Sequence, residues 1–229
     1  MIGALASSTE HASGTSMGSF PRPSIAVVFD AGGGIGSALA EALRSSGRFE
    51  DVVGFTLSTS PSIDLLDEQS LECAASLAST EGELWLVIDA TGFLHDEQQG
   101  PETSWRQLHA ARIARAFALN AIGTALIMKD VLPLLLVGAG KSVFATLSAR
   151  FGSIGDKRLG GWRAYRASKA ALNHLVRTAA VELARRAPEA LCIALHPGTV
   201  AAPLSAPFAA AGLEVHTPAQ AARHRLAAW

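Results

Sequence analysis

The sequence contains little of what marks several common classes of protein. Its 229 residues include two cysteines, one tyrosine and no cluster of lysine or arginine, and the formal net charge is −1. Without a basic cluster, the chain offers no surface typical of nucleic-acid binding. Cys73 and Cys192 lack the spacing of metal ligands and lie among apolar residues. We therefore expect no metal site and two buried thiols in a reducing compartment.

Long apolar runs are also absent. No apolar stretch approaches the roughly 20 residues that a membrane span needs, and the run Val131–Val137 contains Pro133. The first 23 residues are rich in serine, glycine and alanine, and they lack the basic start and apolar segment of a secretory signal. We expect residues 1–23 to be a disordered leader, residues 24–229 to form one domain, and the protein to be cytoplasmic with no membrane partner.

Short apolar runs alternate with helical patterns along the rest of the chain. The runs predict five strands, at Ile25–Phe29, Val52–Leu57, Leu84–Asp89, Val143–Ser148 and Leu191–Leu195. A first helix ends near Gly47, and the other predicted helices are Glu68–Ser79, Trp105–Asp130, Ala164–Arg186 and a short one that begins at Thr217–Pro218. This alternation is typical of a doubly wound parallel sheet. We predict a Rossmann-type α/β domain with a reduced sheet of five to six strands and helices on both faces.

A glycine cluster separates the first strand from the first helix. It consists of Gly32, Gly33, Gly34 and Gly36. A plain tight turn would explain such a cluster. The alternative is a dinucleotide site, in which backbone N–H groups at the helix N-terminus bind a pyrophosphate. In that case Gly34 and Gly36 would let the ligand approach the backbone and let the helix pack against the strand.

Tyr165 and Lys169 lie four residues apart in a long predicted helix, which places the phenol and the ammonium on one face. A free tyrosine has a pKa of about 10, and a neighbouring cation favours the phenolate. Such a tyrosine can exchange a proton with a hydroxyl or carbonyl group. The spacing alone would also fit an ordinary surface pair. Against that interpretation, Tyr165 is the only tyrosine in the chain.

Further polar groups fall at positions where a doubly wound fold binds its ligands. Ser148 ends a strand, and His196–Thr199 follows the last strand, so both lie at the carboxyl edge of the sheet. Asn120 lies inside a predicted helix, although asparagine is a poor helix former. Each has an ordinary explanation as a strand end, a turn or an exposed polar position. Their order and placement together favour a functional site.

Taken together, these residues resemble the short-chain dehydrogenase/reductase family over most of the domain. The segments Thr91–Asp96 and Ser148–Arg150 are most similar to bacterial C-factor-like members. The resemblance implies that Tyr165 is the catalytic acid/base, and that Lys169 lowers the pKa of Tyr165 and holds the nicotinamide ribose. It also implies that Ser148 orients the substrate carbonyl and that Asn120 anchors a proton-relay water.

The same resemblance assigns the residues that would bind the cofactor. The pyrophosphate would lie against the glycine loop, Gly32, Gly33, Gly34, Ile35 and Gly36. Asp64 matches the acidic residue that meets the adenine amino group. The segment beside the adenine ribose would be Ala90, Thr91 and Gly92, and the nicotinamide carboxamide would be approached by Pro197, Gly198 and Thr199.

The chain departs from the family pattern at four points. Asp30 stands where the glycine motif has its first glycine, and a carboxylate there would repel a pyrophosphate. The helix and strand that usually lie between Leu57 and Asp64 are missing. Ala202 replaces a threonine that often holds the cofactor, and the family's last strand is absent. These departures leave the strength of cofactor binding open.

The choice between NAD and NADP is also open. NAD-using members place an acid after the second strand and NADP-using members place a basic residue there, whereas this chain has Ser58, Thr59 and Ser60. The hydroxyls tilt the expectation slightly towards NADP.

Two functions of different classes follow. The first is an NAD(P)-dependent oxidoreductase that transfers hydride between nicotinamide and a small carbonyl or alcohol substrate. The alternative is a cofactor-impaired protein of the same fold with a binding or regulatory role. The resemblance also implies a homodimer or tetramer that packs through Trp105–Asp130 and Ala164–Arg186. Some apolar side chains could line a substrate pocket or belong to the core, namely Phe151, Trp162, Leu204 and Phe208.

Overall fold

A parallel sheet of five strands forms the centre of the molecule, in the order β2-β1-β3-β4-β5. The computed structural model describes residues 24–96, 100–135, 141–155, 160–205, 208 and 214–227. The strands are β1 (Ile25–Phe29), β2 (Asp51–Phe55), β3 (Leu84–Asp89), β4 (Val143–Leu147) and β5 (Leu191–Leu195). A sheet of this order reverses its winding between β1 and β3, where such folds leave a crevice for a ligand.

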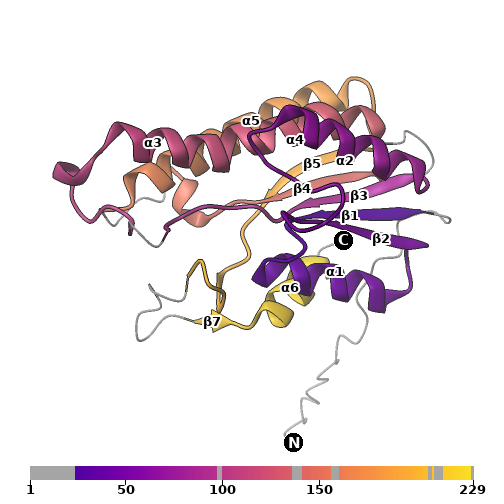
Figure 1. Cartoon of the computed structure of the whole chain (residues 1–229), viewed down its shortest axis with the longest axis horizontal. Helices are drawn as coiled ribbons and strands as arrows, with labels where there is room; N and C mark the ends of the chain where they lie inside the picture. Colours follow the sequence, from indigo (N-terminus) through magenta and orange to yellow (C-terminus); the bar gives the residue numbers. More distant parts are fainter. Residues whose placement is uncertain are drawn as a thin grey trace, which may run out of the picture.

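Helices cover both faces of the sheet (Figure 1). On one face lie α1 (Gly34–Ser46) and α6 (Pro218–Leu226), and on the other lie α2 (Glu68–Thr80), α4 (Gly123–Val131) and α5 (Arg163–Ala184). Because successive side chains of a strand point to opposite faces, Phe29 joins the core under α2, α4 and α5, whereas Val28 joins the core above α1 and α6. The predicted doubly wound fold is confirmed.

The predicted elements differ from the structure mainly at their ends. β2 stops at Phe55, and Leu57 is 81% exposed because the chain has already turned away from the sheet. Asp67 caps α2, since its carboxylate accepts a hydrogen bond from the Gln69 N–H. Thr217 caps α6 in the same way and forms a capping box with Gln220.

The helix predicted over Trp105–Asp130 is not continuous. A 3₁₀ turn (Trp105–Gln107) is followed by α3 (Ala110–Phe117), a π-helical turn (Ala118–Ile122) and α4. The π turn holds Asn120 at its centre, and such turns often occur at functional sites. It inserts an irregularity that changes which side chains face α5.

The expectation that no segment could span a membrane needs a correction. The helical stretch Ala110–Leu134 is long and apolar enough to do so by length and composition, with a mean hydropathy of 1.4. In this structure α3 packs against α5, and α4 packs against α2 and α5, as core helices do in a globular domain. Since a core helix passes the same test, this stretch is weak evidence for a membrane span.

One expectation about the cysteines is wrong. Cys192 is buried in β5, with its Sγ 3.9 Å from Sδ of Met128. Cys73, in contrast, is exposed. It lies on α2, whose buried face is formed by Leu71, Ala74, Ala75 and Ala78.

A second, two-stranded sheet was not predicted. It pairs β6 (Thr199–Val200) with β7 (Val215–His216) in parallel. After β7 the chain enters α6, which packs on α1. The segment that follows β5 is therefore tied to the helix that follows the glycine cluster.

Candidate active site

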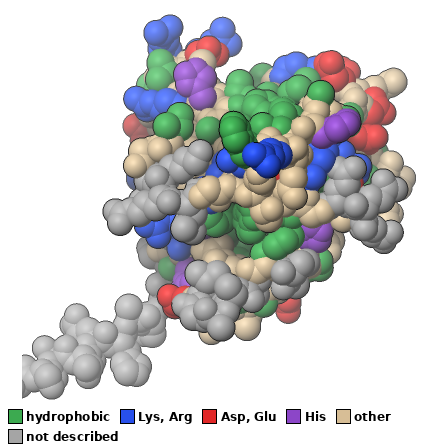
Figure 2. Space-filling view, turned by 90° about the vertical axis from the view of Figure 1, so that its left-hand side faces the viewer, with side chains coloured by type: hydrophobic (Ala, Val, Ile, Leu, Met, Phe, Trp, Pro, Cys, Tyr) green, Lys and Arg blue, Asp and Glu red, His purple; other side chains and the backbone are tan. Residues whose placement is uncertain are grey.

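A cavity of about 340 Å³ opens at the carboxyl ends of the strands. Figure 2 looks onto this end of the molecule and shows hydrophobic side chains gathered around a hollow. Most of the predicted site residues line it: Gly33, Gly34, Ile35, Ala90, Thr91, Gly92, Ser148, Tyr165, Lys169, Pro197, Gly198 and Thr199. The structure therefore brings together residues spread over the whole domain.

The glycine cluster forms a close contact between α1 and β1. A Cβ added at Gly36 would lie 2.0 Å from the carbonyl oxygen of Asp30, so only glycine fits there. Gly33 is the N-cap of α1 and offers no side-chain cap, and the first turn contains no acidic residue. The amides of this turn are thus left to a ligand, which fits a phosphate-binding role.

Asp30 lies at the start of this loop with φ of 61°, in the left-handed region that favours glycine. Its carboxylate fills the space beside Gly33, since a Cβ on Gly33 would lie 2.4 Å from Oδ2 of Asp30. Burial and the nearby charge of Asp89 raise the pKa of Asp30, while the Gly33 backbone amide lowers it. A carboxylate therefore competes for the place where the family binds phosphate.

The segment after β6 lies directly across the glycine loop. A Cβ added at Gly34 would lie 2.9 Å from Cβ of Ala202 and 3.6 Å from Cδ of Pro203. A larger residue at either position would close this contact further. Glycine at position 34 therefore lets the segment after β6 approach the glycine loop closely.

A buried carboxylate, Asp89, organises the centre of the site. It ends β3 and accepts hydrogen bonds from the hydroxyls of Thr91 (2.6 Å), Thr124 (2.7 Å) and Thr146 (2.8 Å). These bonds join β3, β4 and α4 and fix the Ala90–Gly92 segment that lines the cavity. An acidic residue at the end of a fully buried strand is a signal that the sequence contains, but no organising role was assigned to Asp89 from the sequence.

Tyr165 and Lys169 both line the cavity, as their spacing on α5 predicts. The expected lowering of the tyrosine pKa is not found, because burial raises the pKa of Tyr165 to about 12. Lys169 Nζ instead donates a hydrogen bond to the carbonyl oxygen of Leu147, at 2.7 Å. Burial lowers the pKa of Lys169 to about 8, although the charge of Asp89 acts in the opposite direction.

Asn120 is buried and fixes the surroundings of Tyr165 and Lys169. Its Oδ1 accepts from the Phe93 N–H at 2.7 Å, and its Nδ2 donates to the Phe93 carbonyl (2.7 Å) and to Oγ of Ser168 (3.0 Å). The burial of Asn120 therefore excludes the interpretation of this residue as an exposed polar position on a helix. Asn120 connects the loop after β3 to α5, although it does not line the cavity itself.

Ser148 follows β4, and its hydroxyl donates a hydrogen bond to Oδ1 of Asn173 at 2.6 Å. Asn173 was missed from the sequence. It lies four residues after Lys169 and eight after Tyr165, so the three share one face of α5. Gly152 allows this arrangement, because a Cβ there would lie 2.8 Å from Nδ2 of Asn173.

Asp64 is not brought to the cavity. It is exposed, and Oδ1 accepts from the Leu66 N–H, which shapes the entry to α2. The hydroxyl of Thr59 donates to the carbonyls of Thr56 and Pro61, and Oγ of Ser58 bonds to Oγ1 of Thr56. The predicted roles of these residues towards adenine and its ribose stay predictions.

The residues that match a known family cover most of this site. The family described as short chain dehydrogenase matches residues 60–211. The chain belongs to the short-chain dehydrogenase family. As a member of this family, the protein is an oxidoreductase. The match begins after the glycine loop, so the region with Asp30 lies outside it.

Two relatives are similar to this chain in sequence. It is 30% identical over 173 residues to 1-hydroxy-2-glutathionyl-2-methyl-3-butene dehydrogenase of Rhodococcus sp., which covers 75% of this chain and 71% of the relative. It is 39% identical over 99 residues to C-signal of Myxococcus xanthus, which covers 43% and 58%. The second similarity agrees with the predicted likeness to C-factor-like members.

Solved structures share the fold. The NADPH-bound carbonyl reductase from chicken fatty liver superimposes with a TM-score of 0.77 at 21% identity, over 93% of this chain and 89% of that one. A short chain dehydrogenase from Burkholderia cenocepacia in complex with NADP gives a TM-score of 0.73 at 22% identity, over 89% and 83%. These similarities support the doubly wound fold of the dehydrogenase.

Most residues that line the cavity have side chains or backbone groups that suit a nicotinamide cofactor. The uncapped N-terminus of α1 offers amides at one end, and Lys169, Tyr165 and Thr199 lie in the same lining. Asp30 is the one lining group whose charge opposes a pyrophosphate. The lining residues therefore suit a nicotinamide cofactor chemically, except that the charge of Asp30 is unfavourable for the pyrophosphate.

Proposed function

We propose that the protein is an NADP- or NAD-dependent reductase or dehydrogenase that acts on a small carbonyl or alcohol. The observation that carries this proposal is that Ser148, Tyr165 and Lys169 share one cavity with the glycine loop. The cofactor would be held by the loop at Gly33–Ile35 and by Lys169 and Thr199, and it would supply the hydride.

The chain's own residues would handle the substrate oxygen. Tyr165, protonated at neutral pH, donates a proton to the carbonyl oxygen during reduction, and in the reverse reaction its phenolate accepts the proton of the alcohol. The Ser148 hydroxyl turns from Asn173 towards the same oxygen and holds it by a hydrogen bond. Lys169 keeps a positive charge beside the reacting groups, and Asn120 holds α5 and the Phe93 loop in register.

Titration calorimetry with NADPH and NADH tests the first requirement, and the oxidation of NADPH by an added aldehyde tests the second. We expect binding of at least one nucleotide and slow but measurable turnover. NADP is slightly favoured, because solved structures of the same fold bind NADPH or NADP and because no acid follows β2 at Ser58–Ser60. Absence of binding to both nucleotides at millimolar concentration would refute the proposal.

The alternative, a cofactor-impaired protein with a binding or regulatory role, is favoured by the departures from the family pattern, of which Asp30 is the one that lines the cavity with an acidic group. Two carboxylate replacements separate the effects: Asp30→Asn removes the charge and tolerates the left-handed backbone, whereas Asp30→Gly also relieves the strain. If the wild type fails to bind and both variants bind NADPH, the charge is the obstacle and the alternative holds. If affinity does not rise in either variant, Asp30 is not the obstacle.

We also propose that the protein forms a homodimer through α3, α4 and α5. Ile122, at the end of the π turn between α3 and α4, is 51% exposed, and Val181 on α5 is 41% exposed. A two-fold axis would bury them against their copies. Light scattering after size exclusion should give twice the monomer mass, and a lysine at position 181 (Val181→Lys) should shift the protein to monomers. A monomer in the wild type would contradict this.

A further inference from the structure

Three aromatic side chains, Phe151, Trp162 and Phe208, line one part of the cavity and are called the aromatic wall below. The Trp162 ring centroid lies 5.2 Å from that of Phe151 and 5.1 Å from that of Phe208, with interplanar angles of 57° and 66°. Aromatic pairs prefer such tilted and edge-to-face arrangements. Phe151 is 38% exposed, so the wall keeps accessible ring surface.

The aromatic wall is held in place by contacts from outside the cavity. The Arg166 guanidinium lies 4.6 Å from the Phe151 ring centroid, and Nε of Arg166 donates to the Gly161 carbonyl at 3.0 Å. The backbone N–H of Trp162 donates to the backbone carbonyl oxygen of Glu102 at 2.5 Å. A site fixed in this way loses little freedom when a ligand binds, which favours affinity.

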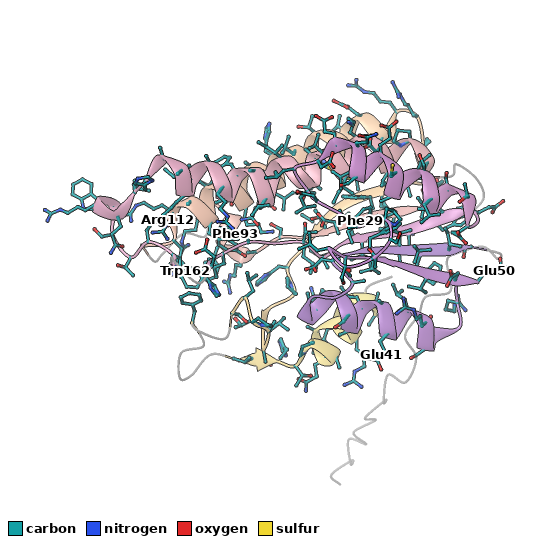
Figure 3. The ribbon with its side chains drawn as sticks, in the orientation of Figure 1. Phe29, Glu41, Glu50, Phe93, Arg112 and Trp162 are labelled. Atoms are coloured by element: carbon teal, nitrogen blue, oxygen red, sulfur yellow. The ribbon has the colours of Figure 1, made fainter. Side chains whose placement is uncertain are left out.

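The backbone of Trp162 is strained. Its φ is 52°, in the left-handed region, and it follows Gly161 with φ of 77°. A bulky residue is rare in this conformation. Trp162 does not cap α5 with its side chain, so helix initiation gives no reason for a tryptophan here. Residues held in such conformations cluster at functional sites, and Figure 3 shows Trp162 at the end of the molecule where the cavity lies.

The aromatic wall meets the catalytic tyrosine directly. The ring centroids of Trp162 and Tyr165 lie 6.3 Å apart at an interplanar angle of 77°. A substrate whose carbonyl oxygen reaches Tyr165 would therefore place the group next to its carbonyl carbon against Trp162. The lining also includes the apolar Leu94 and Leu204, whereas its charged side chains, Asp30 and Lys169, are assigned to the cofactor and catalytic roles.

We infer that the substrates are carbonyl compounds that carry a planar aromatic ring on the carbonyl carbon, with the ring packed against the aromatic wall. The inference rests on the proposed reductase function and names its substrate class. For benzaldehyde as the probe, hydride adds to the carbonyl carbon, Tyr165 protonates the oxygen, and NADPH is oxidised as benzyl alcohol forms. Each aromatic contact contributes roughly two- to tenfold in binding beyond the area it buries.

Three aldehydes of graded character test this class: benzaldehyde, cyclohexanecarbaldehyde and propanal. The second matches the first in size and apolarity but is not planar or aromatic. We expect kcat/KM for benzaldehyde to exceed that for cyclohexanecarbaldehyde by about fivefold or more and that for propanal by more. Equal kcat/KM for benzaldehyde and cyclohexanecarbaldehyde would overturn the inference while leaving the proposed function in place.

Variants locate the preference in the aromatic wall. Trp162→Ala should reduce the benzaldehyde preference to about twofold or less, whereas Trp162→Phe should keep most of it. Trp105→Ala is the matched control, since Trp105 is 67% exposed and does not line the cavity. Phe151→Ala removes another part of the wall at a partly exposed site and should also lower the preference, in case Trp162→Ala does not fold.

The outcomes separate the two proposals. A preference that survives both Trp162→Ala and Phe151→Ala would overturn the inference, because the wall would not cause it. No turnover of any of the three aldehydes, with NADPH bound, would overturn the proposed reaction on carbonyls itself.

Discussion

Replacing Lys169 by methionine should make the protein more stable while removing its activity. Lys169 is 3% exposed, and among the described residues its ammonium has no carboxylate within ion-pair distance. Its polar contact is the hydrogen bond to the Leu147 carbonyl. Methionine has a similar length and leaves an apolar group in place of a desolvated charge.

The size of the effect follows from the pKa of Lys169, which burial lowers from 10.5 to about 8. At about 1.4 kcal/mol per pH unit, this difference corresponds to roughly 3 kcal/mol of lost stability at pH 7. Methionine leaves the Leu147 carbonyl without its donor, which costs about 1 kcal/mol. We expect the Lys169→Met protein to be more stable by about 2 kcal/mol, a rise of about 4–8 °C in melting temperature.

The dependence on pH distinguishes this cause from better packing. A lysine whose folded-state pKa is lowered costs stability fully below pH 8, and the cost disappears as the pH rises towards 10.5. The difference between wild type and Lys169→Met in thermal or urea unfolding should therefore shrink from pH 7 to pH 10. Lys141→Met, at an exposed lysine, is the control and should change little. A Lys169→Met protein less stable than wild type at pH 7, or a difference independent of pH, would refute the reasoning.

Other predictions concern chemistry and packing. Tyr165→Phe should lower kcat for aldehyde reduction by about 10²-fold or more without lowering the melting temperature, because the Tyr165 hydroxyl has no hydrogen-bond partner in the described part of the chain. The steady-state rate of aldehyde reduction should fall above about pH 8, because Lys169 loses its charge there. The rate of alcohol oxidation should rise with pH, because oxidation needs the Tyr165 phenolate and the pKa of Tyr165 is about 12. An oxidation rate that falls from pH 7 to 9 would contradict the role of Tyr165. Asn173→Ala should lower kcat about tenfold with an unchanged calorimetric Kd for NADPH, because it removes the side chain that positions Ser148 beside the cavity; an unchanged kcat would show that Asn173 has no such positioning role. Gly36→Ala should cost about 1–3 kcal/mol in urea unfolding, because its Cβ would meet the Asp30 carbonyl, and a neutral result would be inconsistent with that contact.

The fold was predictable because β1, β3 and β4 are continuous apolar runs that are buried along their whole length. Such runs can hardly serve as anything other than central strands of a covered sheet. The break in the helix around Asn120 was not predictable, because one poor helix former does not by itself mark a π turn, and the hydrogen bonds of Asn120 to Phe93 and Ser168 exist only in the folded chain.

The members of the candidate site were predictable from order along the chain, but their interactions were not. Spacing correctly placed Tyr165 and Lys169 on one face of α5. It could not show that Lys169 turns its ammonium to Leu147 or that burial dominates the pKa of Tyr165. Asn173 carried a usable signal, because it continues the same helical face by one more turn.

The single charge of Asp89 connects the two ends of the cavity. Together with burial it raises the pKa of Asp30 at the glycine loop, and it opposes the lowering of the pKa of Lys169 by burial at the other end. Asp30 and Lys169 therefore share one charged partner, and the effects of substituting them on nucleotide affinity and on catalysis should not be additive. An engineer who removes Asp30 to strengthen cofactor binding would also have to measure again where Lys169 titrates, because both groups interact with the charge of Asp89.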